Sequence, residues 1–376
     1  MDSTIAAGAA ENAARAEREL EALVGVSTPS GDIRGAEEAI AICTALLPVK
    51  VSVERPPCST RGCAPDLLAR IPGRGRLRML LLGHIDTVFP HEAHVPLRRE
   101  GERLYGAGGA DMKGGVVLAL GLARVLSTRP DLFAEVAVLL VTDEEWRTSD
   151  FAHVRRFVGY DACLCFEAGE RAPDGAEAVI VRRKAAGTLR ITASGQAAHS
   201  GSAPDQGRNA LLALAQAALE VSQLHDPNGP QRRSVVPTVM QSGQALNVVP
   251  AAGELVLDIR ADQLDAFAPV LAAVPHSPNG VILTPTLMRK WPGMDTRAAS
   301  RDVIERAAAR IGRPLAGSGR GGASDASHFA ASIPLTIDGL GPRGGGAHTS
   351  GEFVLAPTLR ERAEVALAIA LEILGA

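Results

Sequence analysis

Aromatic residues, lysine and long apolar runs are all scarce in this chain. Aromatics make up 3% of the 376 residues, and only four residues are lysine, so arginine dominates the 39 basic residues. The net charge of −3 provides neither a basic footprint for nucleic acid nor a polybasic membrane patch. No apolar run approaches about 18 residues, so no membrane span is expected.

Secretion signals are also missing, and cysteine is sparse. The first twenty residues contain no basic segment followed by an apolar stretch, so we expect no secretory signal. Five cysteines are an odd number for a disulfide framework, although Cys58 and Cys63 leave a disulfide or a metal pair open. No C-x-x-C pattern accompanies them, which favours free thiols in a reducing cytoplasm.

The patterning predicts two kinds of fold in one chain. Short apolar runs such as "RMLLLGHID", "AEVAVLLVTDEE" and "YDACLCFE" alternate with helical segments such as "KGGVVLALGLARVLS". This is typical of an α/β domain with a mostly parallel sheet and helices on both faces. Residues 187–293 instead follow a β-α-β-β-α-β order, which predicts an inserted ferredoxin-like α+β domain. The α/β domain is then discontinuous, over 1–186 and 294–376.

Ionisable residues gather where the predicted strands end. "GHID", "TDEE" and "CFE" follow three buried runs, and "GGADMKGG" and "GGGAHTSGE" are glycine-rich loops. Each residue alone has an ordinary reading, as a helix cap, a surface histidine or a solvated acidic pair. In a parallel sheet, however, the carboxyl ends of the strands form the ligand-binding edge. The residues gathered there are His84, Asp86, Asp111, Glu144, Glu145, Glu167 and His348.

A pair of metal ions is the natural use of this set. Imidazole and carboxylate together suit zinc best, although they leave other divalent metals open. His84 and Asp86 project to one face of a strand, so Asp86 can hold the second ring nitrogen of His84. Two zinc ions are balanced by three carboxylates and a bridging hydroxide, which makes a partly buried site neutral. Two rival motifs are weaker: the "HEAH" pair His91 and His94 lacks a third ligand, and "GAGGADMKGG" lacks the spacing of a phosphate loop.

In order and spacing, the motifs "GHIDTV", "GAGGADMKGG", "TDEE", "CFE", "GQAAHSG" and "HTSGE" resemble the co-catalytic zinc peptidases. That family includes glutamate carboxypeptidase, aminoacylase, acetylornithine deacetylase and succinyl-diaminopimelate desuccinylase. The resemblance implies that Asp111 bridges two zinc ions, with a cis peptide bond after it. One zinc would take His84 and Glu167, and the other Glu145 and His348. Many relatives have Asp after the bridging Asp, where this chain has Met112; that side chain is not a family ligand.

The resemblance also implies roles for the acids and for the substrate. Glu144 would be the general base and acid, and Asp86 would orient His84. The expected substrate is a small peptide or N-acyl amino acid with a free carboxylate beside the scissile amide. Its carboxylate would be bound by Asn247 and Arg260 of the inserted domain and by Gly321 and Gly322 of a glycine-rich loop. Arginine suits a bidentate carboxylate contact, although Arg260 also has a plain reading as a sheet-surface charge.

Specificity and assembly complete the expectations. Arg320 and Arg183 are weaker candidates to bind an acidic side chain of the substrate. "RGGASDASHF" and "RRKAAGTLRI" look most like the glutamate carboxypeptidase branch, with an N-acyl amino-acid deacylase or a non-catalytic binding relative as alternatives. The resemblance implies a homodimer through the inserted domain, in which His199 donates to the oxyanion of the partner's site. The ordinary reading of His199 is a surface histidine near a helix start.

Overall fold

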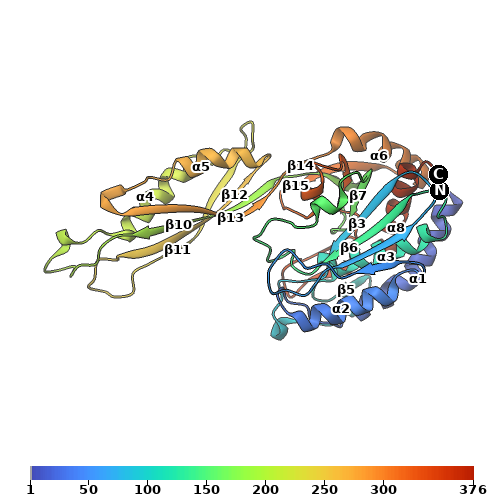
Figure 1. Cartoon of the computed structure of the whole chain (residues 1–376), viewed down its shortest axis with the longest axis horizontal. Coiled ribbons are helices and arrows are strands. Elements are labelled where there is room, and N and C mark those ends of the chain that lie inside the picture. The colour runs from blue at the N-terminus through green and yellow to red at the C-terminus, as the bar shows by residue number, and fades with distance from the viewer. Residues whose placement is uncertain (1) are drawn as a thin grey trace. The chain divides into compact units, whose positions relative to one another are not determined.

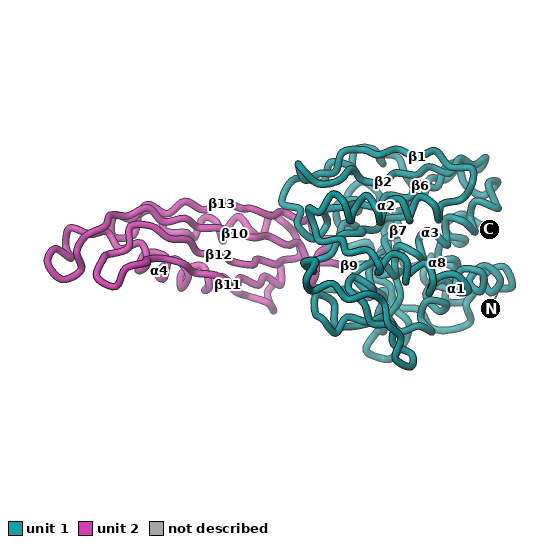
Figure 2. Tube along the Cα trace, turned by 90° about the horizontal axis from the view of Figure 1, so that it is seen from below, with its two compact units in different colours: residues 1–182, 295–320, 324–376 teal, residues 183–294, 321–323 magenta. Residues whose placement is uncertain are grey.

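The computed structural model describes residues 2–376 of the chain, which divide into two compact units. Unit 1 comprises residues 2–182, 295–320 and 324–376, and unit 2 comprises residues 183–294 and 321–323 (Figures 1 and 2). The helices are α1 Ser3–Val24, α2 Ile33–Leu46, α3 Gly114–Ser127, α4 Ala210–Ser222, α5 Ala268–Ala272, α6 Arg297–Ile311, α7 Ala326–Phe329 and α8 Pro357–Leu374.

A six-stranded sheet forms the centre of unit 1, in the order β1-β2-β6-β3-β7-β16. Its strands are β1 Ser52–Glu54, β2 Leu67–Pro72, β3 Arg78–His84, β6 Glu135–Val141, β7 Ala162–Cys165 and β16 Leu335–Ile337. β3 runs parallel to both β6 and β7, and β7 runs parallel to β16. β2 is antiparallel to both of its neighbours, β1 and β6. The parallel strands therefore carry their carboxyl ends to one edge.

Helices cover both faces of this sheet because its strands are apolar on both sides. Met79 and Leu81 of β3 face the main core, which α1, α3 and α8 complete (Figure 1). Leu80 and Leu82 alternate with them and are equally buried. On that second face α7 packs on β7 and β16, and Phe329 of α7 makes an edge contact with Phe157. The near-continuous apolar strands of the sequence thus correspond to a two-sided sheet.

Two smaller sheets complete unit 1. One has the order β17-β18-β5-β4, from β17 Gly344–Gly345, β18 Phe353–Leu355, β5 Arg103–Tyr105 and β4 Arg98–Glu100. The other joins β9 Glu177–Arg183 to β8 Glu170–Arg171, β14 Met294–Asp295 and β15 Leu315–Arg320. Their two- to seven-residue strands are too short for a clear alternation, which is why the sequence patterning does not predict them. The first of these sheets holds the loop that carries His348.

Unit 2 is an antiparallel sheet with its helices on one face. Its strands are β10 Ala185–Ser194, β11 Ser234–Ser242, β12 Ala252–Ala261 and β13 Ile282–Trp291, in the order β11-β12-β10-β13. Inward residues such as Leu189, Ile191 and Leu257 pack with Ala217 of α4 and Val270 of α5 in a separate core. This is the β-α-β-β-α-β arrangement of a ferredoxin-like unit. The predicted fold class, an α/β unit with an inserted α+β unit, is confirmed.

Candidate active site

Five side chains predicted as metal ligands, and the neighbouring Glu144, converge at one edge of the central sheet. His84 ends β3, Glu144 and Glu145 follow β6, and Glu167 stands two residues after β7. Asp111 lies in the turn before α3, and His348 lies in the loop between β17 and β18. Within residues 2–376, the groups of ionisable side chains with metal-binding geometry all come from this set. The parallel topology explains the convergence, since four of these residues lie at or just beyond the carboxyl ends of three neighbouring strands.

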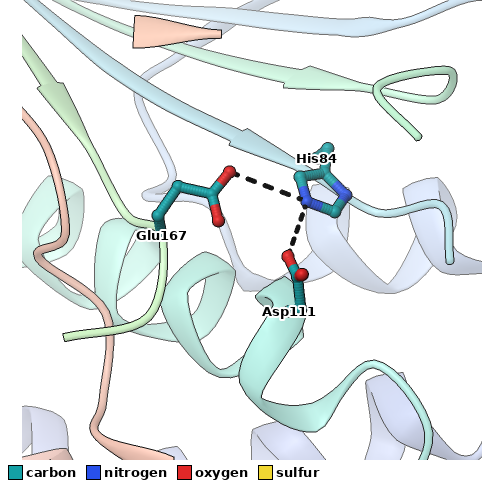
Figure 3. A group of neighbouring side chains, drawn as sticks. All are labelled: His84, Asp111 and Glu167. Atoms are coloured by element: carbon teal, nitrogen blue, oxygen red, sulfur yellow. Dashed lines mark hydrogen bonds and ion pairs between the residues drawn. The ribbon is translucent and has the colours of Figure 1, made fainter. Parts of the chain in front are cut away.

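The first group contains His84, Asp111 and Glu167 (Figure 3). Nε2 of His84 lies 3.2 Å from Oδ1 of Asp111 and 3.9 Å from Oε1 of Glu167. The other ring nitrogen, Nδ1, lies 3.0 Å from the backbone oxygen of Asp86 and 3.4 Å from its Oδ1. Because Nδ1 faces acceptors, a neutral His84 turns an unprotonated Nε2 toward the two carboxylates, as a metal ligand must.

The second group contains Asp111, Glu145 and His348. Nε2 of His348 lies 3.1 Å from Oδ2 of Asp111 and 3.1 Å from Oε1 of Glu145. His348 has a φ of 64°, a left-handed conformation that is uncommon for a residue with a side chain. The loop around it therefore holds the ring against the carboxylates at a local conformational cost.

These residues fit a pair of divalent cations. The two oxygens of Asp111 face different histidines, as a carboxylate that bridges two cations does. Without metal, hydrogen bonds to Asp111 and Glu145 raise the pKa of His348 to about 10. Burial opposes a charge on His84, but its bonds to Asp111 and Asp86 still raise its pKa well above the ordinary value. Each imidazole is thus held as a cation among acids, so the site attracts positive charge at two positions. Histidine and carboxylate donors suit zinc.

Glu144 occupies a different environment from its neighbour Glu145. Its side chain is buried, and burial raises its pKa to about 7. It joins a third group of converging side chains, with His84 and Glu145, whereas His348 contacts Glu145. A carboxyl group that titrates near neutrality beside a metal site can both accept and return a proton.

Asp86 holds the turn that carries both glutamates. Its Oδ1 accepts the backbone N–H of Glu144 at 3.1 Å, and its Oδ2 accepts that of Glu145 at 3.1 Å. Ser30 donates its hydroxyl to Oδ2 at 2.6 Å. The buried carboxylate therefore fixes the positions of His84, Glu144 and Glu145 together. Sequence reasoning missed Ser30; the only available signal was the turn-forming "TPSGD".

Glu352 supports the turn of Asp111 in the same manner. Its buried carboxylate accepts the backbone N–H groups of Gly108, Ala110 and Asp111 at 3.0, 2.8 and 2.9 Å. The peptide bond between Asp111 and Met112 is cis, as the family resemblance implied. Glu352 lies in the motif "HTSGE", but the motif does not predict this role, because a carboxylate that supports a backbone turn 241 residues away leaves no local pattern.

Arg147 joins the turn that carries Glu144 and Glu145 to the loop before α7. Its guanidinium is fully buried, lies 2.9 Å from Oδ1 of Asp143 and also bonds Asp325. Its Cζ atom lies 4.2 Å from the centroid of the Phe151 ring, so the guanidinium stacks over that ring. Asp143 in turn accepts the backbone N–H of Thr60 at 2.7 Å. A buried ion pair of this kind fixes geometry, and no local pattern predicts the pairing of Arg147 with Asp325, 178 positions away.

The predicted substrate and oxyanion residues of unit 2 are more exposed. Arg260 is bound by Asp258 on its own strand, at 2.8 Å, and Asn247 has an exposed side chain. Nδ1 of exposed His199 accepts the backbone N–H groups of Gly201 and Ser202, each at 3.1 Å. A neutral His199 therefore carries its proton on Nε2, ready to donate.

The glycine-rich loop and its arginines divide between the units. Gly321 and Gly322 belong to unit 2, where Arg183 donates to the backbone oxygen of Gly322 at 3.0 Å. Arg320 belongs to unit 1 and pairs with Glu170 at 2.6 Å. Both arginines thus have protein partners in this structure.

The rival histidine pair of "HEAH" takes no part in the candidate site, whereas "GAGGADMKGG" contributes Asp111 to it. His91 contacts the hydroxyl of Ser27 at 2.9 Å, and neither it nor His94 joins a metal-binding group among residues 2–376. All five cysteines, including Cys58 and Cys63, are free. No helix among residues 2–376 combines the length and apolarity that crossing a bilayer demands.

Relatives of known activity match most of the chain. Residues 80–372 match peptidase family M20/M25/M40. Carboxypeptidase G2 of Pseudomonas sp. (strain RS-16) is 28% identical over 358 residues, which cover 89% of this chain and 83% of that protein. Succinyl-diaminopimelate desuccinylase of Halorhodospira halophila is 29% identical over 311 residues, which cover 75% of this chain and 79% of that protein.

Solved structures share the fold over nearly its whole length. Aminopeptidase PepT from Bacillus cereus has a TM-score of 0.77 at 20% identity, covering 96% of this chain and 98% of that one. The M20 family metallo-carboxypeptidase Sso-CP2 from Sulfolobus solfataricus has a TM-score of 0.73 at 15% identity, covering 96% and 99%. The chain therefore belongs to peptidase family M20/M25/M40 and is a metal-dependent peptidase or amidohydrolase.

Proposed function

We propose that this enzyme is a dizinc carboxypeptidase of the glutamate carboxypeptidase type, which cleaves an amide beside a free carboxylate. The observation that carries the proposal is Asp111, whose two oxygens face His84 and His348, with the buried carboxyl of Glu144 beside them. The match to carboxypeptidase G2 over 89% of the chain supports the peptidase branch.

In this proposal His84, Glu167 and Asp111 hold one zinc ion, and Asp111, Glu145 and His348 hold the other. When bound, zinc lowers the pKa of a water to about 7 and polarises a carbonyl. Glu144 takes a proton from the attacking water at its carboxylate and passes it to the leaving nitrogen. In the metal-free protein burial raises the pKa of Glu144 to about 7, and bound cations would lower it and favour the carboxylate form that accepts the proton. Asp86 keeps Glu144 and the ligands in register through its backbone contacts.

The clamp for the substrate carboxylate is assigned to Asn247 and Arg260, with Gly321 and Gly322 as backbone donors and Arg320 as a reader of an acidic side chain. Arg260 presents a planar guanidinium that Asp258 orients within the strand. A carboxylate of the substrate would share that guanidinium with Asp258. We also propose a cytoplasmic location, supported by the five free thiols.

An N-acyl amino-acid deacylase is the second candidate. It is favoured by the desuccinylase of Halorhodospira halophila, which matches 75% of the chain. A turnover screen of the zinc-loaded protein separates the two, with C-terminal dipeptides in one arm and N-acetyl and N-succinyl amino acids in the other. Faster turnover of dipeptides supports the carboxypeptidase. Faster turnover of acyl amino acids supports the deacylase, and no turnover in either arm contradicts both.

A two-fold homodimer through unit 2 is part of the proposal. The edge strand β11 exposes Val236, Val239 and Met240, and helix α4 exposes Leu212 and Leu219. An unpaired strand edge with exposed apolar side chains is suited to symmetric pairing. His199 would donate from Nε2 to the oxyanion of the partner's site, a contribution of about 2.7–4 kcal/mol for one such donor.

Mixing inactive variants tests this arrangement. Homodimers of His199→Ala and of Glu144→Gln should each have little activity. Random exchange of subunits makes half of the dimers mixed, and each mixed dimer has one intact composite site, so about a quarter of wild-type activity should return. Two results would remove the trans role of His199. One is proven subunit exchange without rescue of activity, and the other is full activity of a protein that light scattering shows to be a monomer.

A further inference from the structure

The two tryptophans of the chain have opposite environments. Trp291 is 1% exposed, whereas Trp146 is 64% exposed. Tryptophan is on average a highly buried residue, so an indole left in solvent calls for an explanation. Trp146 directly follows Glu145 on the turn that also carries Glu144. Consecutive Cα atoms are about 3.8 Å apart, so the exposed indole begins within one residue of a proposed metal ligand.

Gly31 lies against one side of the indole of Trp146. Gly31 has a φ of 86°, and a Cβ placed on it would lie 3.0 Å from Cζ3 and 3.5 Å from Cε3 of Trp146. The six-membered ring therefore rests against backbone where a side chain would collide with it, and where a left-handed conformation disfavours any other residue. One part of the ring is held, and the rest faces solvent.

Hydrogen bonds tie this support to the catalytic turn. Ser30, the neighbour of Gly31, donates its hydroxyl to Oδ2 of Asp86 at 2.6 Å. The same oxygen accepts the backbone N–H of Glu145 at 3.1 Å. The backbone N–H of Ser30 also donates to the oxygen of Thr87 at 3.1 Å. Trp146 and its seat therefore share one buried anchor with the proposed metal ligands.

The chemistry of the ring differs from that of its neighbours. Glu144, Glu145 and His348 are ionisable, whereas the indole presents an apolar, π-rich face. Such a face packs against apolar or aromatic groups and adds nothing to the binding of a carboxylate. In the proposed function, the carboxylate end of the substrate already has its own residues, Asn247 and Arg260. The part of the substrate left for an apolar surface on this turn is the acyl part, on the carbonyl side of the scissile amide.

We propose that Trp146 is a specificity-determining residue that packs against an apolar, preferably aromatic, group on the carbonyl side of the scissile amide. The inference rests on the proposed function, because it takes the cleaved bond to lie at the Asp111 centre. Gly31 is its positioning residue. The group on the substrate comes either from an N-aroyl amino acid or from the side chain of an N-terminal aromatic residue, and both offer the same flat apolar surface.

Matched substrates test the proposal in the zinc-loaded enzyme. N-benzoyl and N-acetyl derivatives of one amino acid form the first pair, and dipeptides with phenylalanine or glycine before the same residue form the second. Trp146→Ala should lower kcat/KM on the aromatic member by about tenfold, from lost burial and stacking, and change the small member by less than twofold. Trp146→Phe should retain most of the preference. The pair with the larger loss identifies the source of the aromatic group.

The control is Val158→Ala, which removes an apolar side chain that is 67% exposed in the same unit. Val158 lies near Asp161, whose backbone N–H bonds Arg78 at the opposite, amino end of β3, so no preference should change. A second variant, Gly31→Ala, leaves the indole intact but displaces it. It should reduce the aromatic preference in the same direction as Trp146→Ala, with unchanged zinc content.

Fluorescence gives a readout that needs no turnover. Adding the N-benzoyl amino acid to Glu144→Gln should change the tryptophan emission, and the change should vanish in Glu144→Gln with Trp146→Phe. Equal losses on aromatic and small substrates, or an emission change that survives without Trp146, would overturn the assignment. If the parent enzyme cleaves none of the substrates, the proposed function fails, whereas the titration still decides whether Trp146 contacts the aromatic group.

Discussion

The two units position their candidate site residues by different physical means. In unit 1, the carboxylates of Asp86 and Glu352 accept backbone N–H groups of the very turns that carry Glu144, Glu145 and Asp111. In unit 2, His199 and Asn247 are exposed. The proposed hydrolytic centre is thus organised by buried hydrogen bonds before any substrate arrives, whereas the proposed clamp combines the exposed Asn247 with an Arg260 that already pairs with Asp258 on its own strand.

The largest effect should come from separating the two neighbouring glutamates of unit 1. Glu144→Gln should keep both metals and lose turnover by about 10²–10⁴-fold or more, because the proton carrier is gone. Glu145→Gln should lose metal as well, since its carboxylate contacts His348 within a ligand group. Elemental analysis measures the metal content of each variant, and steady-state kinetics measure its turnover. Two metals in Glu145→Gln, or near-normal rates in Glu144→Gln, would reverse these roles.

The clamp of unit 2 gives the next largest effect. Arg260→Ala should cost about 2–5 kcal/mol in transition-state binding of a free-acid substrate, because a carboxylate loses its charged partner. A C-terminally amidated substrate should already be poor for the parent, and the substitution should then change its kcat/KM little. Asp258→Asn, which keeps Arg260 but removes its strand partner, is the matched control. Equal cleavage of acid and amide by the parent would mean that no such clamp exists.

Stability distinguishes buried organisation from exposed pairing. Arg147→Met leaves Asp143 and Asp325 without their buried cation, and should lower the free energy of unfolding by about 3–5 kcal/mol. Arg99→Met removes an exposed pair with Glu17, 2.7 Å apart, and should cost about 0–1 kcal/mol. Urea unfolding of both variants with zinc present measures the difference. Similar losses would show that Arg147 does not organise the site.

The smallest effect is a pH dependence of the metal-free protein. The raised pKa values of His348, about 10, and of His84 stabilise the fold below about 6.5, and this contribution is lost as the pH rises through the folded values. Burial raises the pKa of Glu144 from 4.5 to about 7. The buried carboxyl therefore keeps its proton longer than it does in the unfolded chain, and the free energy of unfolding falls as the pH rises from 4.5 to about 7. Metal-free protein should therefore weaken from pH 5 to pH 8.5.

Zinc should oppose this trend, because it binds neutral imidazole and displaces the two protons. The difference in Tm between zinc-loaded and metal-free protein should therefore widen from pH 6 to pH 8.5 in differential scanning calorimetry. A difference that narrows over this range would contradict the picture of imidazolium ions held among carboxylates.

Much of the architecture follows from local patterns. The apolar runs that end at His84, Val141 and Cys165 predict parallel strands, and parallel strands must bring their carboxyl ends to one edge. That rule, with the family's motif order, is enough to group the proposed ligands. The alternation in residues 187–293 likewise predicts an antiparallel sheet with helices. These features depend on periodicities of two and of 3.6 residues, which the sequence displays directly.

Tertiary structure alone decided the supports of the site. Ser30 meets Asp86, Glu352 meets the turn at Asp111, and Arg147 meets Asp325, across 56, 241 and 178 positions of the chain. Each contact is a directional bond between polar atoms that only the packed sheet and its loops bring within about 3 Å, so no sequence periodicity predicts it. The seat of Trp146 on Gly31 is of the same kind. The sequence by itself determined which residues can do the chemistry, and long-range packing decided what holds them in place.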